Sequence, residues 1–529
     1  MIEPDEARYA EIPREMLATR DFVTPRLDAA HYFEKPPLLY WANAASIALL
    51  GPTPFAARLP TRLAALATVA LLIGALGSAE LPGLGLWSAL IYLSAPLSWI
   101  LARYNITDGL LTCALTLAFL ALRRFLLRRE EGKPATGALA VLGIGVGLAT
   151  LAKGLIGIVF PGLVFLLWIA IMGRWRRLAE LLVSPAPVLL LAVAAPWFVL
   201  VERANPGFAK IFFIREHFQR FATPEAARPG PIYYFVLAFI AGFLPWTVVF
   251  PRALAPLASA ARGWRERARA HADTLFFALW FFVILVFFSL SHSKLLPYIL
   301  PAFPAAAVLT ARAILSAREH VRTPLLVHAV LATVIVAGGF GAGVYTGELA
   351  RYGVTALAAL GGALLLAGSW LAVWQARQGA ARAFIPAALG WAGVYLALAL
   401  MMPRVSEDLS SHALAEVAGA QAAAAGGALV VAYHCYPQTF PWELRRPIVV
   451  ADYVDELGSD GVRPDSLFWS RSEFWRRWNA GERMIVVTKR RTMRDFQSTS
   501  IAPTMLASNR TYVLVTNTTP AGTRPLATP

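Results

Sequence analysis

Charged residues are scarce in this sequence. Asp, Glu, Lys and Arg make up 15% of its 529 residues, whereas 57% are hydrophobic, and the mean hydropathy is +0.57. A soluble protein of this length needs a more polar surface. Apolar runs of roughly 18 or more residues, which are typical of membrane spans, recur along the chain. We therefore expect a polytopic α-helical membrane protein.

Cysteine is nearly absent as well, and neither of the two cysteines belongs to a recognisable motif. Cys113 lies in an apolar run and Cys435 in a polar region, so we expect neither an intrachain disulfide nor a redox or metal motif. No basic stripe interleaved with stacking aromatics occurs outside the apolar runs. The net charge of +16 thus indicates basic cytoplasmic loops rather than a nucleic-acid partner.

The apolar runs divide the chain into spans and a polar tail. After residue 403, short apolar stretches alternate with helix-like stretches, a pattern typical of a small α/β domain. We predict a transmembrane domain over 1–403, with outer loops 1–56 and 203–231, and a separate domain over 404–529. The twelve predicted spans are roughly 57–76, 83–103, 107–123, 136–152, 154–173, 182–202, 232–254, 274–290, 295–315, 323–345, 354–375 and 382–402.

Basic residues set the predicted orientation. The loops after the odd-numbered spans from the third onward each carry several arginines, whereas the short loops after spans two, four, eight and ten hold only Lys153, Lys294 and Arg351. The positive-inside rule places the arginine-rich loops in the cytoplasm. The first 56 residues and the C-terminal domain would then lie outside. No apolar segment precedes residues 1–56, so either this segment is translocated as a short tail or one more span lies upstream of Met1, and we expect the second.

The first polar motif is DEARYAEIPREM at residues 5–16, which includes Asp5 and Arg8. Its pattern fits an amphipathic helix lying on the membrane surface. The alternative is a solvated charged helix with pairs three and four residues apart.

The second motif is YFEKPPLLYW at 32–41, where Glu34 and Lys35 stand between aromatic residues and a proline pair. The prolines end any helix there. The following 13 apolar residues are too few to span a membrane and suit an interfacial helix. A snorkelling lysine in an aromatic belt is one interpretation. The other is a lysine held at headgroup depth, where a lipid phosphate would lie.

Further ionisable residues occur where predicted spans reach the outer face. Asp108 and Lys153 lie at such span ends, and an ionisable residue at membrane depth is a functional-site hypothesis. The motif FFIREHFQRF brings His217 and Arg220 into the long outer loop, and SHSKLLPYILP contains Tyr298. Carboxylates and several cations on one membrane face suit an enzyme that acts on a phosphate-bearing lipid.

The order of these motifs resembles one known family. DEARYAEIPREM, YFEKPPLLYW, RYNITD, AKG, EHFQRF and SHSKLLPYILP stand as in ArnT-type lipid A aminoarabinose transferases, which belong to the GT-C and protein-mannosyltransferase-like group. The C-terminal stretch YHCYPQTFPWELRRPIVVADYVDELG is similar to that family's periplasmic domain. The resemblance covers nearly the whole chain. Thirteen spans are typical of the family, which agrees with the expected upstream span.

The resemblance implies an activity and roles for single residues. A sugar, most simply 4-amino-4-deoxy-L-arabinose, would move from undecaprenyl phosphate to lipid A at the periplasmic face of the bacterial inner membrane. Asp5 would be the catalytic acidic residue, Arg8 would orient it or contact substrate, and Asp108 would be a second functional carboxylate. The residues implied to bind or adjoin the polyprenyl phosphate are Lys35, Lys153, Arg220 and Tyr298.

The resemblance also bears on cofactors. Glu34 and His217 resemble positions that can hold a divalent metal such as zinc or magnesium in a structural role. No cofactor is expected to be required for the reaction.

Two alternatives stay open. The first is a related transferase that uses another sugar or acceptor, including protein O-mannosylation. The second is a polytopic lipid transporter, which predicts ionisable residues along the midplane of a pathway rather than at one face.

Overall fold

The computed structural model describes residues 1–76, 81–219, 229–258, 263–316, 321–377, 380–406, 410–453, 457 and 462–518. It forms two compact units. The first unit gathers residues 1–34, 40–57 and 403–529, and the second gathers 35–39 and 58–402. The N-terminal segments thus group with the C-terminal residues, while the predicted division of the chain at 403 stays a prediction.

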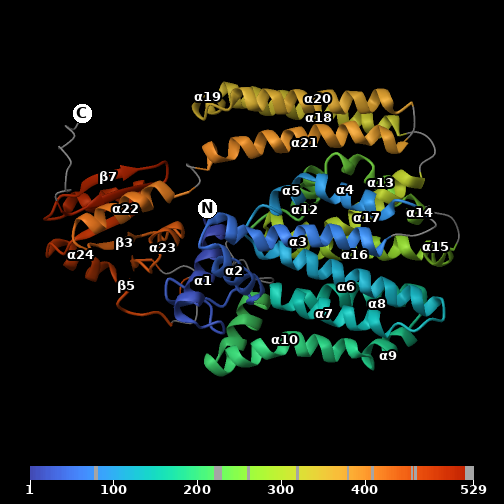
Figure 1. Cartoon of the computed structure of the whole chain (residues 1–529), viewed down its shortest axis with the longest axis horizontal. Coiled ribbons are helices and arrows are strands. Elements are labelled where there is room, and N and C mark those ends of the chain that lie inside the picture. Colours follow the sequence, from blue (N-terminus) through green and yellow to red (C-terminus); the bar gives the residue numbers. More distant parts are fainter. Residues whose placement is uncertain are drawn as a thin grey trace. The chain divides into compact units, whose positions relative to one another are not determined.

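The second unit is a bundle of long apolar helices (Figure 1). Nine helices among the described residues are long and apolar enough to cross a membrane. The helices of this region are α3 (Pro54–Ala75), α4 (Leu84–Ser94), α5 (Pro96–Leu101), α6 (Thr107–Glu130), α7 (Thr136–Lys153), α8 (Ile156–Met172), α9 (Arg176–Leu182), α10 (Pro185–Ala204), η1 (Lys210–Gln219), α12 (Tyr234–Gly242), η3 (Trp246–Val248), α13 (Phe250–Ala253), α14 (Ala255–Ala258), α15 (Trp264–Ala270), α16 (Ala272–Leu290), η4 (Leu296–Ala302), α17 (Phe303–Ser316), α18 (Arg322–Tyr345), α19 (Glu348–Arg351), α20 (Thr355–Gln375) and α21 (Ala380–Val405).

The predicted polytopic helical fold is confirmed, although two of the predicted spans are broken and a third, at 154–173, is a single but short helix. The span predicted at 83–103 is two helices that meet at Ala95, which is extended before Pro96. The span at 232–254 is likewise broken after Gly242. The span at 154–173 is one helix of 17 residues. Proline restricts the residue before it, which explains the break at Ala95.

Two glycines of α7 let two neighbouring helices approach closely. A Cβ on Gly145 would lie 2.9 Å from the backbone of Ala118 in α6. On the other side, a Cβ on Gly143 would lie 2.3 Å from the carbonyl of Ala186 in α10. Without a side chain at these positions, α7 fits between α6 and α10, as small residues permit in membrane bundles.

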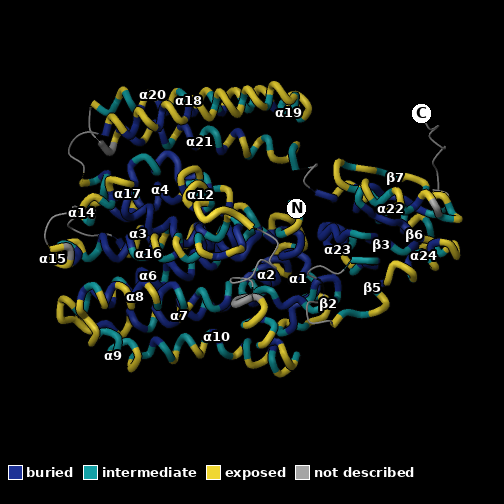
Figure 2. The backbone as a smooth tube through the Cα atoms, turned by 180° about the vertical axis from the view of Figure 1, so that it is seen from behind, coloured by how far each residue is buried: buried dark blue, intermediate teal, exposed yellow. Residues whose placement is uncertain are grey.

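The helices differ in how deeply they lie inside the bundle. Helix α6 is buried over 72% of its most apolar stretch, whereas α18 and α20 are each buried over 22%. Figure 2 shows exposed positions running along α18 and α20. Their exposed side chains are apolar, for example Val334 and Leu360, as expected for helices that face lipid.

Ion pairs tie several helices together at the end of the bundle where the predicted cytoplasmic loops begin. Asp273, in the first turn of α16, accepts hydrogen bonds from Arg123 of α6 at 2.5 Å and from Arg312 of α17. Arg129 of α6 pairs with Glu180 of α9 at 3.1 Å. The ends of α6, α9, α16 and α17 that carry these charges therefore lie close together.

The first unit begins with helix α1 (Asp5–Thr19), the short strands β1 (Arg26–Leu27) and β2 (Ala30–His31), and helix α2 (Leu38–Leu50). Pro13 interrupts the hydrogen bonds of α1, since it has no N–H to donate to the carbonyl of Tyr9. Asn43 of α2 donates to that carbonyl at 2.9 Å instead. Because of Pro13, the carbonyl of Tyr9 is free to accept the hydrogen bond that joins α2 to α1.

The C-terminal part of this unit is a six-stranded sheet in the order β5-β4-β3-β6-β8-β7. Strands β3, β4, β5 and β6 are parallel, and β7 and β8 are antiparallel to their neighbours. This confirms the predicted α/β domain. Its elements are α22 (His412–Ala424), β3 (Leu429–Tyr433), α23 (Thr439–Leu444), β4 (Val449–Ala451), β5 (Phe468–Trp469), α24 (Arg471–Asn479), β6 (Met484–Lys489), η5 (Arg490–Ser498), β7 (Thr504–Ser508) and β8 (Tyr512–Thr516).

The pairs three residues apart that the sequence predicted in α1 are present as Asp5–Arg8 and Glu11–Arg14, but both interpretations of its surroundings are wrong. Neither a helix on the membrane surface nor a solvated charged helix would bury its acidic side chains, yet Glu6, Glu11 and Glu15 are buried. Helix α1 contacts α23 of the C-terminal domain. Trp442 of α23 packs against Ala10 in a shared apolar cluster. The partner lies more than 400 residues away along the chain, so periodicity within α1 could not reveal it.

Candidate functional site

Three of the predicted site residues meet in the second unit. The ammonium of Lys153 lies 2.5 Å from the Asp108 carboxylate and 4.2 Å from the centre of the Tyr298 ring. The side chains of Lys153 and Asp108 are 9% and 7% exposed. This arrangement combines a buried ion pair with a cation–π contact, and we call these residues the Asp108–Lys153–Tyr298 cluster.

Local chain geometry explains why these residues come together. Asp108 lies in the first turn of α6 and Lys153 is the last residue of α7. A carboxylate at a helix N-terminus and a cation at a C-terminus are both favoured by the helix dipole. Gly154 ends α7 with a φ of 75°, a conformation that favours glycine. Tyr298 lies in η4, whose second residue is Pro297, and η4 contacts α6.

Lys294 is a second buried lysine of this unit, and no site role was assigned to it from the sequence. Its ammonium donates to the carbonyls of Phe288 and Ser289, at 3.0 and 2.7 Å, at the end of α16. It also lies 5.5 Å from the centre of the Phe235 ring. These contacts satisfy the terminal carbonyls of α16, so the structure accounts for Lys294 as a helix cap.

Asp5 and Arg8 form a second group, in the first unit. Their side chains approach to 3.8 Å on successive turns of α1, and Arg8 is 4% exposed while Asp5 is 35% exposed. The Arg8 guanidinium donates to the Tyr32 hydroxyl at 3.1 Å. Tyr32 thus fixes the arginine that faces Asp5. Tyr32 was missed from the sequence because it stands 24 residues from Arg8, and only its place in an aromatic motif hinted at a role.

Two other carboxylates of the first unit, those of Glu15 and Asp28, are buried. Glu15 accepts hydrogen bonds from the backbone N–H groups of Asp28 and Ala29 at 2.6 and 3.0 Å. Asp28 in turn accepts from the N–H of Ile448 at 2.8 Å. Burial, and then the neighbouring Glu11, raise the pKa of Glu15 to about 8. Burial, and then Glu15, also raise the pKa of Asp28 well above its usual value.

The remaining predicted residues are placed as follows. Glu34 belongs to the first unit and Lys35 to the second, and both are half-buried between β2 and α2. Arg220 and the side chain of His217 lie outside the described residues. Within the described residues no group of three or more His, Cys, Asp or Glu side chains could hold a metal ion. The metal site at Glu34 and His217 therefore stays a prediction.

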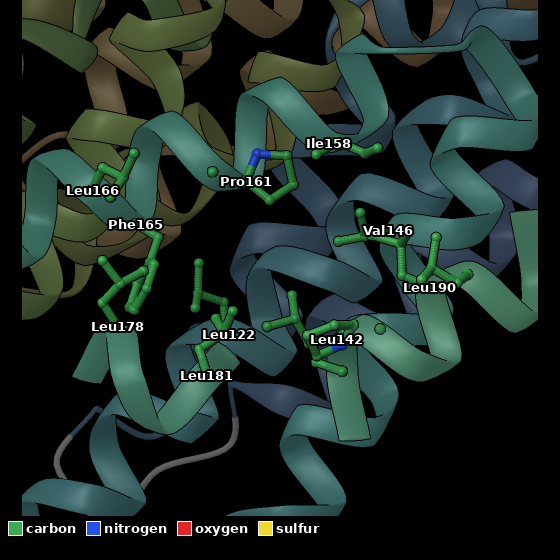
Figure 3. A pocket seen from close by; sticks show the side chains of 15 residues that line it. Leu122, Leu142, Val146, Ile158, Pro161, Phe165, Leu166, Leu178, Leu181 and Leu190 are labelled. Carbon is green, nitrogen blue, oxygen red and sulfur yellow. The ribbon is translucent and has the colours of Figure 1, made fainter. Parts of the chain in front are cut away.

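An apolar pocket of about 420 Å³ opens in the second unit, between α6, α7, α8, α9 and α10 (Figure 3). Leu142 and Val146 of α7 line it together with Phe165 and Leu190. Val146 precedes Lys153 by seven residues, or about 10 Å along the helix. The pocket can accommodate hydrocarbon and contains no group that could catalyse a reaction.

The two polar groups offer complementary chemistry. Lys153 presents a fixed cation with donors beyond the one used by Asp108, which suits an anionic oxygen. Asp5 presents a carboxylate that is one-third exposed and oriented by a buried arginine. Each group, taken by itself within its own unit, has a known use in catalysis: a fixed cation stabilises a developing anion, and a positioned carboxylate acts as a base or stabilises positive charge.

Two family models match the chain. Residues 2–212 match the one described as dolichyl-phosphate-mannose-protein mannosyltransferase. Residues 414–517 match the aminoarabinose transferase C-terminal domain.

Curated relatives and a solved structure agree with these matches. An undecaprenyl phosphate-alpha-4-amino-4-deoxy-L-arabinose arabinosyl transferase of Aeromonas hydrophila is 37% identical over 314 residues, 58% of this chain and 55% of that protein. The one from Serratia proteamaculans is 34% identical over 58% of this chain and 54% of its own length. The match thus spans about half the length of these relatives. The crystal structure of ArnT from Cupriavidus metallidurans bound to undecaprenyl phosphate superposes with a TM-score of 0.84 at 27% identity, over 98% of this chain and 94% of that one.

Replacing Lys153 should leave the buried carboxylate of Asp108 without a counter-charge. We expect Lys153→Met to lower the free energy of unfolding by about 3–5 kcal/mol, since Asp108 is left without its cation. The double variant Lys153→Met/Asp108→Asn should lose less than the single variant. Lys294→Met is the control, because it removes a buried ammonium without stranding a carboxylate. Chemical unfolding in detergent measures all three, and a double variant no more stable than Lys153→Met would contradict the pairing.

Glu15 should make stability depend on pH. Its pKa is about 8 in the folded protein against an ordinary value of 4.5, so between these values the folded state binds the extra proton. The free energy of unfolding should therefore fall as pH rises from 5 to 8. Glu15→Gln should flatten this slope.

The matched control for this prediction is Glu473→Gln on α24. Hydrogen bonds from Arg476 and Arg477 lower the pKa of Glu473 to about 2, so this group stays charged over the whole range from pH 5 to 8. The control should keep the wild-type slope. Equal slopes in wild type and Glu15→Gln would show that Glu15 is ionised throughout.

Proposed function

Since this chain belongs to the ArnT-type family of multi-pass membrane glycosyltransferases, we propose that it transfers 4-amino-4-deoxy-L-arabinose from undecaprenyl phosphate to a phosphate of lipid A. The observation that carries the choice of sugar is the match of 414–517 to the aminoarabinose transferase C-terminal domain. The relatives named above support the same donor.

The proposed reaction exchanges one bond for another. The bond between the sugar's C1 and the donor phosphate oxygen breaks, and C1 bonds to an acceptor phosphate oxygen. Undecaprenyl phosphate leaves with the bonding electrons and gains negative charge. Cations that touch this phosphate stabilise the charge as it develops. The proposed phosphate ligands are Lys35, Lys153 and Arg220, with Tyr298 beside Lys153.

The proposed role of Asp5 follows from the acceptor. A lipid A phosphate is already anionic near neutral pH, so a strong general base is not needed. Asp5, oriented by Arg8, would instead position the sugar or stabilise the positive charge that develops at C1 as the leaving group departs. Asp108 would hold Lys153 in place. A hydroxyl acceptor would change this assignment, because Asp5 would then be the natural base.

We propose the bacterial inner membrane as the location and its periplasmic face as the reaction side. The distribution of arginines among the loops supports this orientation. The paired charges Asp108 and Lys153 stand at helix ends, which favours an enzyme acting at one membrane face over a transporter with charges along a midplane pathway.

Asp5→Asn tests the activity and the catalytic assignment together. Mass spectrometry of lipid A from cells with the wild-type protein should show the mass increment of aminoarabinose, and lipid A from cells without the protein should lack it.

Asp5→Asn should reduce transfer by purified protein by roughly a hundredfold or more, while binding of undecaprenyl phosphate persists. Asp21→Asn, in the partly exposed pair with Arg26, is the control. A different increment would identify another sugar, and near-normal Asp5→Asn activity would remove Asp5 from the mechanism.

Lys35→Ala tests the phosphate assignment. Glu34 precedes Lys35 and two prolines follow it, so the ammonium has a restricted range. A charge-assisted contact to phosphate contributes about 1.5–3 kcal/mol, hence a loss of about tenfold to a hundredfold in affinity for undecaprenyl phosphate. Lys35→Arg should be partly tolerated. Lys133→Ala, in a pair whose side chains are more than half exposed, is the control. Unchanged affinity with lowered expression would instead identify Lys35 as a membrane anchor.

A further inference from the structure

The sheet of the C-terminal domain contains a topological switch point. Strands β3, β4 and β5 follow one another toward one edge, whereas β6 lies on the other side of β3. In open parallel sheets, ligands bind in the crevice at the carboxyl ends of the strands where the order reverses. Here that place is at the ends of β3 and β6.

The chain's own Glu3 lies close to this edge of the sheet. Its carboxylate accepts a hydrogen bond from the N–H of Thr439, in the connection after β3, and another from the Ser411 hydroxyl, each at 3.2 Å. The Glu3 carboxylate also contributes, after burial, to the raised pKa of the Cys435 thiol and the Tyr512 hydroxyl. These residues flank the ends of β3 and β8. A carboxylate of the chain therefore stands close to the place where a related fold would bind a ligand.

Two further contacts join the N-terminal segment to the same stretch of the C-terminal domain. Arg14 of α1 donates to the carbonyl of Arg445 at 3.1 Å, and its guanidinium is held by Glu11 at 2.5 and 2.7 Å. Asp28 accepts from the N–H of Ile448. Glu3 precedes α1, Arg14 lies within it and Asp28 follows it. Each of the three residues forms a hydrogen bond to the stretch 439–448.

We propose that residues 439–448, which we call the docking segment, together with Ser411, position helix α1 for catalysis through Glu3, Arg14 and Asp28. The C-terminal domain then binds the enzyme's own Glu3, two residues before Asp5. The C-terminal domain acts on the reaction by fixing where Asp5 and Arg8 stand. This inference rests on the proposed function, because the catalytic role of Asp5 is assigned there.

The test compares Glu3→Ala with Glu3→Gln in the full-length purified protein, using undecaprenyl-phosphate-linked aminoarabinose as donor. Glu3→Ala removes both carboxylate oxygens that accept hydrogen bonds from Thr439 and Ser411. We expect kcat to fall about tenfold to a hundredfold, since a small misplacement of the Asp5 carboxylate has an effect of this size. The KM for the donor and the Tm should stay close to wild type. Glu3→Gln should recover most of the kcat, because its amide oxygen accepts from Thr439 and its amide N–H donates to Ser411.

Two other variants make the comparison sharper. Ser411→Ala removes one donor to Glu3 without removing a side-chain cap of α22, and it should lower kcat several-fold even if Glu3→Ala does not fold. Glu473→Ala, on α24 of the same domain, should leave kcat unchanged.

Wild-type kcat in both Glu3→Ala and Ser411→Ala would overturn the proposal. A loss in Glu3→Ala that Glu3→Gln does not restore, or one that follows a lowered Tm, would overturn it as well. Absence of transfer by the wild-type protein would instead contradict the proposed function.

Discussion

A buried charge needs a partner, and this constraint shapes both units of the protein. Removing an ion from water costs several kcal/mol, which only a close and well-directed counter-charge or hydrogen bond offsets. Asp108 and Lys153 meet this requirement through each other. Glu15 and Asp28 meet it differently: burial raises the pKa of each carboxyl group, which favours the neutral form, and each accepts hydrogen bonds from backbone N–H groups of another segment. Each such contact fixes the relative place of two chain segments.

Hydropathy predicted the helical bundle well because lipid imposes a simple rule on the chain. Every span must be apolar over its length, so spans such as 107–123 and 323–345 were visible from composition alone. Breaks within the apolar runs were less visible. Ala95 precedes a proline within a continuous apolar run. The two helices that meet at Ala95 were therefore predicted as one span. The alternation of short apolar and helix-like stretches after 403 likewise predicted the α/β domain, but not the direction of its strands.

The site was only partly predictable for a related reason. Asp108, Lys153 and Tyr298 could be identified singly, because charged and aromatic groups near span ends stand out in an apolar sequence. Their meeting depends on how α6, α7 and η4 pack, and no spacing in the sequence contains that information. Tyr32, which holds Arg8, was missed for the same reason. The burial of α1 was misjudged because its partner Trp442 belongs to a distant part of the chain.

The pairing of Lys153 with Asp108 also suits the proposed role in phosphate binding. A buried ammonium without a counter-charge would destabilise the folded protein. The Asp108 carboxylate offsets this cost in free energy while no substrate is bound. An ammonium has three donors, of which Asp108 uses one. A phosphate oxygen can therefore be bound by the others without breaking the ion pair. The same contact restricts the lysine to one place, so that the charge is already positioned when the phosphate arrives.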